Sequence, residues 1–210
     1  MTDLIFYTNP QSRGRIAHWM LEELAEPYEI KWLDYGPEGT KSDAYLAVNP
    51  MGKLPAITHG GRAVTETPAI CAYLAACFPE RNLQPAAGDP GLADYFRWLF
   101  FAAGPLEQSI TVQSMGWTVP EERKGTVGFG SHEETLEAIE LALQQGSCIC
   151  GEQFTAADVY VASHLSWGML FGGVDKRQQF EAYVALATDR PAYRKANQIN
   201  EERLAETGSA

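Results

Sequence analysis

An acidic residue beside a strongly marked helix start is the feature of this sequence best suited to binding chemistry: Glu66 precedes Thr67 and Pro68. Threonine is a good N-cap residue, and proline is favoured at the first helical position. The free backbone N–H groups and the dipole of a helix start favour an anion, whereas the carboxylate of Glu66 favours a cation. A spot that accepts both suits an α-amino-acid head group. The alternative is an ordinary capped helix with an incidental acid.

A second candidate feature is Pro55, which follows Lys53 and Leu54 just before an expected strand. If the Leu54–Pro55 peptide bond is cis, Leu54 presents its N–H and C=O to an extended peptide lying alongside, rather than to its own sheet. An ordinary trans proline that opens a strand is the alternative. Together the two features describe a site for a short peptide with a zwitterionic end and a backbone-like middle.

The elements that would position these residues alternate in type up to about residue 79. Apolar or alternating segments predict strands at 4–7, 28–33, 56–58 and 63–65. Helical spacing and proline stops predict helices at about 12–25, 42–48 and 68–78. The order βαβαββα needs a parallel strand pair with a right-handed crossover, followed by an antiparallel hairpin. This is the order of a thioredoxin-like domain.

Beyond residue 79 the composition changes, and strand patterns disappear. Residues 80–91 are rich in proline and glycine and predict a linker. Helices are expected at 92–115, 131–145, 156–170, 176–187 and about 191–204. Capping boxes mark two of these starts, one from Ser131 to Glu134 and an acidic variant from Thr155 to Asp158. The fold class expected is therefore α/β followed by all-α.

Bulk composition excludes several classes of function. The 210 residues are 45% hydrophobic and 20% charged, a mix typical of soluble globular proteins. The net charge of −11 and the pI near 4.8 disfavour binding to nucleic acid or to anionic lipid. No segment approaches the roughly 18 continuous apolar residues of a membrane helix, and the first residues do not resemble a signal peptide. We expect a cytoplasmic protein without a membrane partner.

The cysteines and histidines predict no metal site. The four cysteines form no C-x-x-C pair, and their pattern is typical of reduced, partly buried thiols. The four histidines are scattered without H-x-x-x-H spacing.

The segment NPMGKLPAI, followed by TETPAICAYL, resembles the glutathione-site signature of cytosolic glutathione transferases. In that family the site lies in a thioredoxin-like domain that precedes an all-helical one. The resemblance implies a glutathione-binding domain at residues 1–79, a linker at 80–91, and a helical domain at 92–210 that forms the electrophile pocket. It also implies that the capping box at 155–158 is a structural element of the helical domain.

The resemblance assigns roles to individual residues. Leu54 would pair its backbone with the cysteinyl part of glutathione, and Pro55 would be the cis-proline. Glu66 and Thr67 would hold the γ-glutamyl head. Many relatives have serine where Thr67 stands, but threonine keeps the hydroxyl.

A local group of cations is also expected near this site. Glutathione is anionic and the chain carries a charge of −11, so nearby positive charge must offset long-range repulsion. Arg13 and Arg15 fall near the expected site. Lys53 is a candidate for a glutathione carboxylate, and Lys41 for the glycine end.

Transfer chemistry needs the glutathione thiol as a thiolate. A free thiol with pKa about 8.5 is only a few per cent ionised at pH 7. Lowering the pKa by about two units requires roughly 2.7 kcal/mol, and one charge-assisted hydrogen bond to sulfur supplies about 1.5–3 kcal/mol. A single hydroxyl near a helix N-terminus is therefore sufficient.

Three side chains compete as that donor. Ser12 lies at the expected start of the first helix and resembles the serine of serine-type transferases, although a plain N-cap serine is the other interpretation. Tyr7 resembles the tyrosine of tyrosine-type classes, but there the tyrosine lies closer to the arginines. Asn9 is the third candidate. We predict Ser12.

The function expected is transfer of glutathione to small hydrophobic electrophiles, with glutathione as substrate, no metal, and a detoxification role as a homodimer. The alternatives are a glutathione-dependent isomerase, dehalogenase or peroxidase of the same fold, or a non-catalytic interaction protein. Aromatic residues of the helical domain are candidates for the electrophile pocket or for the core: Trp98, Phe100, Phe101, Trp117, Tyr160, Trp167 and Phe171.

Overall fold

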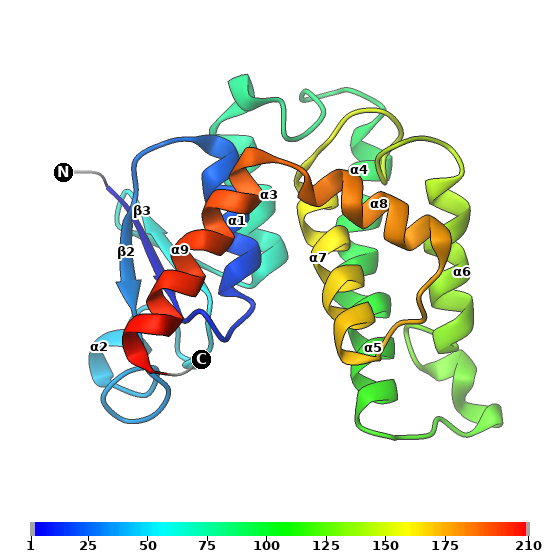
Figure 1. Cartoon of the computed structure of the whole chain (residues 1–210), viewed down its shortest axis with the longest axis horizontal. Coiled ribbons are helices and arrows are strands. Elements are labelled where there is room, and N and C mark those ends of the chain that lie inside the picture. The colour runs from blue at the N-terminus through cyan, green and yellow to red at the C-terminus, as the bar shows by residue number, and fades with distance from the viewer. Residues whose placement is uncertain (1–2, 209–210) are drawn as a thin grey trace. The chain divides into compact units, whose positions relative to one another are not determined.

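The computed structural model describes residues 3–208, which form two compact units (Figure 1). Within this range, the first unit contains residues 3–81 together with residues 190–208. The second unit contains Asn82–Asp189.

The first unit is built on a four-stranded mixed sheet with the strand order β2-β1-β3-β4. The strands are β1 (Leu4–Thr8), β2 (Glu29–Trp32), β3 (Ala56–His59) and β4 (Arg62–Thr65). β1 is parallel to β2 and antiparallel to β3, which forms a hairpin with β4. The hairpin turns at Gly60 and Gly61, which both have positive φ, as a two-residue turn requires. The expected order βαβαββα of a thioredoxin-like domain is confirmed.

The two faces of the sheet bury different side chains of β1. Leu4, Phe6 and Thr8 are buried, and the Phe6 ring lies 5.4 Å from the ring of His18 on α1 (Gly14–Leu24). α1 packs against α3 (Thr67–Cys77) on this face. Tyr7 points to the opposite face, where its ring lies 5.6 Å from that of Tyr45 on the short helix α2 (Asp43–Leu46).

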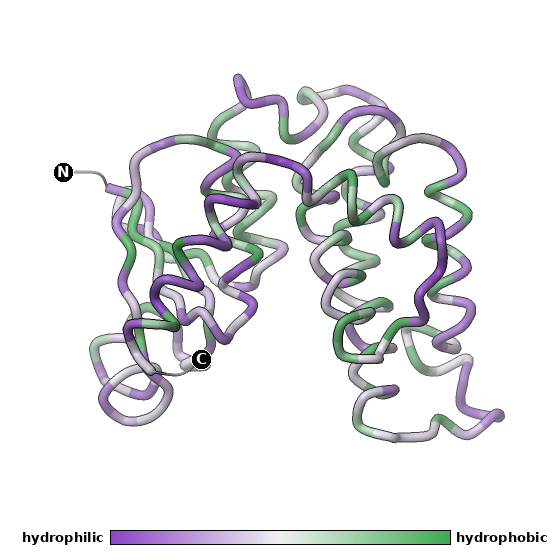
Figure 2. The backbone as a smooth tube through the Cα atoms, viewed as in Figure 1, coloured by the Kyte–Doolittle hydropathy of each residue, from purple (hydrophilic) through white to green (hydrophobic). Residues whose placement is uncertain are grey.

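The last helix, α9 (Pro191–Thr207), packs against α1 of the first unit, although the sequence pattern placed it in the helical domain at 92–210. α9 is mostly hydrophilic (Figure 2), so charged and polar contacts carry much of this packing. Arg190 makes a bidentate ion pair with Glu23 at 2.6 and 2.7 Å. Lys195 pairs with Glu22 at 2.7 Å. Periodicity cannot reveal which unit such a helix joins, and the domain boundaries themselves stay a prediction.

A buried histidine connects α1, α9 and the segment before β2. His18 is fully buried, and its two ring nitrogens lie 2.9 Å from the Tyr28 hydroxyl and 2.9 Å from Asn200 Nδ2. The Tyr28 hydroxyl donates in turn to Glu22. Burial lowers the pKa of His18 from 6.5 to about 4, and the nearby charge of Glu22 only partly opposes this effect.

This low pKa predicts a loss of stability in acid. Between pH 6.5 and about 4 the unfolded chain binds a proton at His18 that the folded protein does not, so the stabilisation is complete above pH 6.5 and is lost as the pH falls through about 4. We expect this residue to account for about 2 kcal/mol of the unfolding free energy lost between about pH 7.5 and pH 5. Urea unfolding of the native protein and His18→Phe at both pH values measures it. Equal pH dependence in the two proteins would contradict the prediction.

The second unit is a bundle of helices: α4 (Leu92–Phe101), α5 (Glu107–Ser114), α6 (His132–Leu143), α7 (Ala156–Phe171) and α8 (Gln178–Thr188). The helix expected at 92–115 is continuous from Leu92 to Ser114, but a π-helical turn at Ala102–Leu106 divides it into α4 and α5. Pro105 lies in this turn. Its missing N–H and its ring are incompatible with regular α-helical bonding, so the helix widens there.

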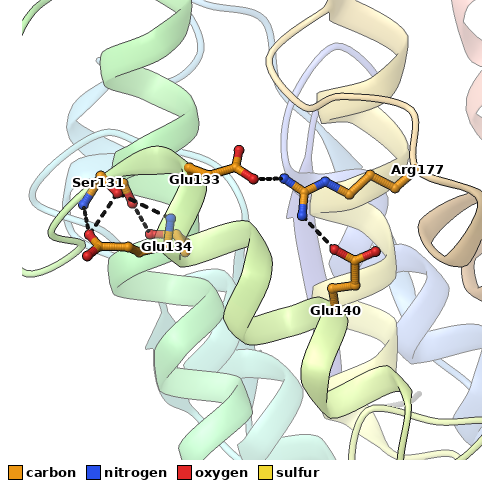
Figure 3. A network of polar contacts seen from close by, with 6 residues as sticks. Ser131, Glu133, Glu134, Glu140 and Arg177 are labelled. Atoms are coloured by element: carbon orange, nitrogen blue, oxygen red, sulfur yellow. Dashed lines mark hydrogen bonds and ion pairs between the residues drawn. The ribbon is translucent and has the colours of Figure 1, made fainter.

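Both expected capping boxes are present. At the start of α6 the Ser131 hydroxyl accepts from the Glu134 amide, while the Glu134 carboxylate accepts from the Ser131 amide at 2.9 Å (Figure 3). In the same view Arg177 bridges Glu133 and Glu140 of α6, at 2.6 Å from each. At the start of α7, Thr155 and Asp158 form the second box. Within residues 3–208, no helix has the length and apolar character needed to cross a membrane.

Candidate functional site

Strand register brings three predicted segments to one edge of the sheet. Tyr7 of β1 pairs with Ala56 of β3, and Ala56 pairs with Thr65 of β4. The end of β1, the start of β3 and the end of β4 therefore lie side by side. The loop after β1, the Leu54–Pro55 segment and the start of α3 all leave the sheet at this edge.

Leu54 has the backbone expected of a peptide-binding residue. The Leu54–Pro55 bond is cis, as the first of the two sequence interpretations required. Among residues 3–208, no hydrogen bond uses the amide or the carbonyl of Leu54. Since unpaired backbone groups strongly favour a partner, these two groups are available to an extended ligand.

The carbonyl before Leu54 is fixed by two side chains that sequence reasoning missed. The Tyr45 hydroxyl donates to the Lys53 carbonyl at 2.6 Å, and Asn49 Nδ2 donates to it at 2.8 Å. Asn49 Oδ1 also accepts from the Met51 amide at 3.1 Å, which closes the loop. Burial raises the pKa of Tyr45 to about 12, so the phenol remains a donor. The only sequence signal was Asn49-Pro50, which predicted a helix stop.

The same loop depends on Gly52 and Lys41. Gly52 has φ +58°, and a Cβ there would lie 2.5 Å from the Thr40 carbonyl oxygen. Lys41 Nζ donates to the Met51 carbonyl at 2.8 Å. Lys41 thus helps to hold the loop. Lys53, at the end of the same loop, has an exposed side chain.

The start of α3 places an exposed carboxylate beside a buried hydroxyl. Glu66 has φ 64° and ψ 117°, which is unusual for a residue with a side chain and typical of strained functional positions. Thr67 is only 5% exposed. The expected cap assignment is wrong by one position: the Glu66 carbonyl already accepts from Ile70 N at 2.9 Å, so Glu66 is the N-cap and Thr67 the first helical residue.

This helix start can receive an anion. The amides of Thr67 and Ala69 donate to no acceptor within residues 3–208, and Pro68 between them has no N–H. The hydroxyl of Thr67 likewise makes no hydrogen bond within that range. Two open N–H groups and a hydroxyl suit a carboxylate, and the Glu66 carboxylate suits an ammonium group.

Ser12 lies just before Arg13, the N-cap residue of α1, and its hydroxyl pairs with the first residue of the helix. Its Oγ accepts from the Gly14 amide at 2.9 Å and donates to the Asn9 carbonyl at 2.7 Å. Asn9 shapes the same loop, because its Oδ1 accepts from the Gln11 amide and its Nδ2 donates to the Leu33 carbonyl, both at 2.9 Å. Tyr35, which sequence reasoning missed, donates to the Gln11 carbonyl at 3.3 Å. Tyr7 lies on the other face of the sheet, against Tyr45.

Of the cations expected near the site, Arg15 is already engaged by other residues of the chain. Arg15 Nε donates to the Pro10 carbonyl at 2.6 Å, and Arg15 also forms an ion pair with Glu201 of α9 at 2.7 Å. Arg15 therefore ties the β1–α1 loop to α9. Residues 3–208 contain no group of three or more His, Cys, Asp or Glu side chains arranged to hold a metal.

The predicted aromatic residues of the second unit divide by burial. Trp98 and Tyr160 are core residues at 4% and 1% exposure, and Phe101 and Trp167 are half-buried. Three are exposed: Phe100, Trp117 and Phe171.

Comparison with known sequences gives a consistent result. A family model described as "Glutathione S-transferase, N-terminal domain" matches residues 13–77. Glutathione S-transferase GstA of Escherichia coli O157:H7 is 30% identical over 190 residues, which cover 89% of this chain and 93% of that protein. Maleylacetoacetate isomerase of Pseudomonas aeruginosa is 29% identical over 171 residues, which cover 77% and 78% of the two chains.

Solved structures agree with these relatives. A glutathione transferase from Methylococcus capsulatus aligns with a TM-score of 0.79 and 26% identity, covering 94% of this chain and 98% of that one. A sphingomonad glutathione S-transferase complexed with glutathione aligns with a TM-score of 0.77 and 25% identity, covering 94% and 98%.

Proposed function

Because the chain belongs to the glutathione S-transferase family, we propose that it binds glutathione at the sheet edge described above and transfers its thiolate to small hydrophobic electrophiles. The main support for this proposal is that two sets of binding groups, the Leu54 backbone and the start of α3, lie at the same edge of the sheet. Leu54 offers an unpaired amide and carbonyl, and the start of α3 offers open N–H groups beside the Glu66 carboxylate. A tripeptide with an amino-acid head matches both.

In this arrangement the cysteinyl backbone of glutathione pairs with Leu54. The γ-glutamyl carboxylate accepts from the start of α3 and the Thr67 hydroxyl, while its ammonium group donates to Glu66. Lys53 supplies positive charge for the glycine carboxylate, with Lys41 as a second candidate. The glutathione complex of the sphingomonad relative supports this choice of ligand.

Ser12 is the proposed donor to the glutathione sulfur. Its hydroxyl lies at the N-terminus of α1, where the helix dipole also favours a thiolate. Residues 1–79 form the proposed glutathione domain and 80–91 the linker, with the electrophile pocket supplied by 92–210. A cytoplasmic homodimer with a detoxification role completes the proposal.

Conjugation of glutathione to an aromatic halide activated by nitro groups tests the proposed function. The thiolate adds to the ring carbon and halide leaves, so product absorbance reports the rate above a protein-free control. Calorimetry with S-methylglutathione, which cannot react, measures binding separately. Absence of binding would overturn the proposed site, whereas binding without conjugation would overturn only the transfer step.

Replacing Glu66 with glutamine is expected to raise the Kd for glutathione about tenfold, because a charge-assisted hydrogen bond becomes a neutral one. Calorimetry measures the change. Glu29→Gln is the matched control, since Glu29 is an exposed residue of β2, at the opposite end of the strand order. A glutathione analogue without the α-amino group provides a second control. If Glu66→Gln weakens this analogue as much as it weakens glutathione, Glu66 does not bind the ammonium group.

A further inference from the structure

The hydroxyl of Thr8 is buried and has no hydrogen-bond partner in the part of the chain that the structure describes. Thr8 is fully buried at the end of β1, and its Oγ1 has no hydrogen-bond partner among residues 3–208. Its carbonyl is paired normally, accepting from the Leu33 amide at 2.9 Å. An unsatisfied buried hydroxyl is unfavourable, and valine would fit a strand equally well. The side-chain oxygen therefore needs an explanation.

Thr8 lies beside Ser12 at the start of α1. The position that a Cβ on Gly14 would occupy lies 1.9 Å from Thr8 Oγ1 and 2.8 Å from Ser12 Oγ. Both hydroxyl oxygens therefore pack against the same small residue, and only glycine leaves room for them.

The hydrogen bonds of Ser12 leave one place for a further donor. A hydroxyl donates once and accepts twice. Ser12 Oγ accepts from the Gly14 amide and also lies within hydrogen-bonding reach of the Tyr35 hydroxyl, whose own proton is donated to the Gln11 carbonyl. The Ser12 proton goes to the Asn9 carbonyl, which also accepts from the Ser12 amide at 3.0 Å. The Asn9 carbonyl thus stays paired if the Ser12 proton turns away.

We propose that Thr8 is a positioning residue whose hydroxyl donates to Ser12 Oγ when Ser12 turns its proton toward the glutathione sulfur. The inference rests on the proposed function of Ser12. Ser12 keeps its proton throughout, and two donors, Thr8 Oγ–H and the Gly14 amide, then hold its oxygen. Donors in series strengthen one another, so the Ser12 hydroxyl becomes a better donor to the thiolate.

Thr8→Val tests this proposal, because it removes the hydroxyl and keeps the shape. We expect thermal stability to be unchanged or higher, since an unsatisfied group is lost. The thiol pKa of bound glutathione, followed by ultraviolet absorbance of the thiolate, should rise by about half to one unit, with kcat/KM about 1.5-fold to threefold lower at pH 7. Binding of S-methylglutathione should not change. Thr8→Ser should restore the native pKa.

The double variant Thr8→Val with Ser12→Ala separates the proposal from indirect effects. Thr8→Val should have no further effect on the thiol pKa when Ser12 is absent. A native thiol pKa in Thr8→Val, or the same shift with and without Ser12, would overturn the role of Thr8. Absence of a thiolate signal in the native protein would instead overturn the proposed function, and this inference with it.

Discussion

Replacing Ser12 with alanine is expected to lower the conjugation rate about 25-fold at pH 7. Without the hydroxyl, the thiol pKa returns toward its free value, about two units higher, and the thiolate fraction at pH 7 falls from about three quarters to about 3%. Steady-state kinetics with the aromatic halide measure this loss. The loss should appear in kcat and kcat/KM together, because the substitution leaves the proposed γ-glutamyl and cysteinyl contacts unchanged.

The resting hydrogen bond of Ser12 does not oppose this role. The Ser12 hydroxyl donates to the Asn9 carbonyl, with 2.7 Å between the two oxygens. This neutral carbonyl still accepts from the Ser12 amide after the hydroxyl has turned away. A thiolate is charged and therefore a stronger acceptor than a carbonyl. Rotation about one side-chain bond then exchanges a weaker hydrogen bond for a stronger one.

A pH profile separates the loss of the hydrogen-bond donor to sulfur from the loss of the acceptor for the Gly14 amide. Ser12→Ala also removes the acceptor of the Gly14 amide, which costs about 1 kcal/mol of stability but leaves the thiol pKa alone. If the donor is what matters, activity recovers at about pH 9, where the thiol ionises unaided. Ser12→Thr keeps the hydroxyl and should keep the low pKa. A large rate loss confined to Tyr7→Phe would make Tyr7 the donor instead.

Local chemistry explains why the backbone features of the proposed peptide-binding edge could be predicted. Leu54–Pro55 and Glu66-Thr67-Pro68 are short patterns whose backbone consequences depend on neighbours in sequence. The alternation along β1 then places Tyr7 and Thr8 on opposite faces wherever the strand lies. The strand pairing of Tyr7 with Ala56, and of Ala56 with Thr65, brings the segments together.

The supporting contacts were not predictable, because no motif or local pattern marks the residues that make them. Nothing near Arg15 indicates that Glu201 of α9 forms an ion pair with it. Arg15 also donates to the Pro10 carbonyl, so both contacts hold its side chain. No sequence pattern around Tyr45 indicates that its hydroxyl donates to the Lys53 carbonyl. The positive φ of Glu66 breaks local preference, so propensity could not reveal it.

Replacing Asp158 with alanine is expected to lower the free energy of unfolding by about 3–5 kcal/mol, the largest stability effect of a single side chain that we predict. Asp158 is fully buried at the start of α7. One carboxylate oxygen accepts from the Thr155 amide at 2.8 Å and from its hydroxyl at 3.1 Å. The other accepts from the Ile149 amide at 2.7 Å and the Tyr183 hydroxyl at 2.9 Å. Alanine leaves these buried donors unpaired.

The capping box of α6 provides the matched control for this effect. Glu134 makes the same contacts with Ser131, but the pair is exposed, and water replaces the carboxylate when it is removed. Glu134→Ala should therefore cost much less than Asp158→Ala in urea unfolding at the same pH. Asp158→Asn keeps one carbonyl oxygen, which can accept from one of the two pairs of donors. Its loss of unfolding free energy should therefore lie between those of Glu134→Ala and Asp158→Ala. Equal losses at the two boxes would mean that Asp158 acts only as a helix cap, and that the contacts with Ile149 and Tyr183 add little to the stability of the second unit.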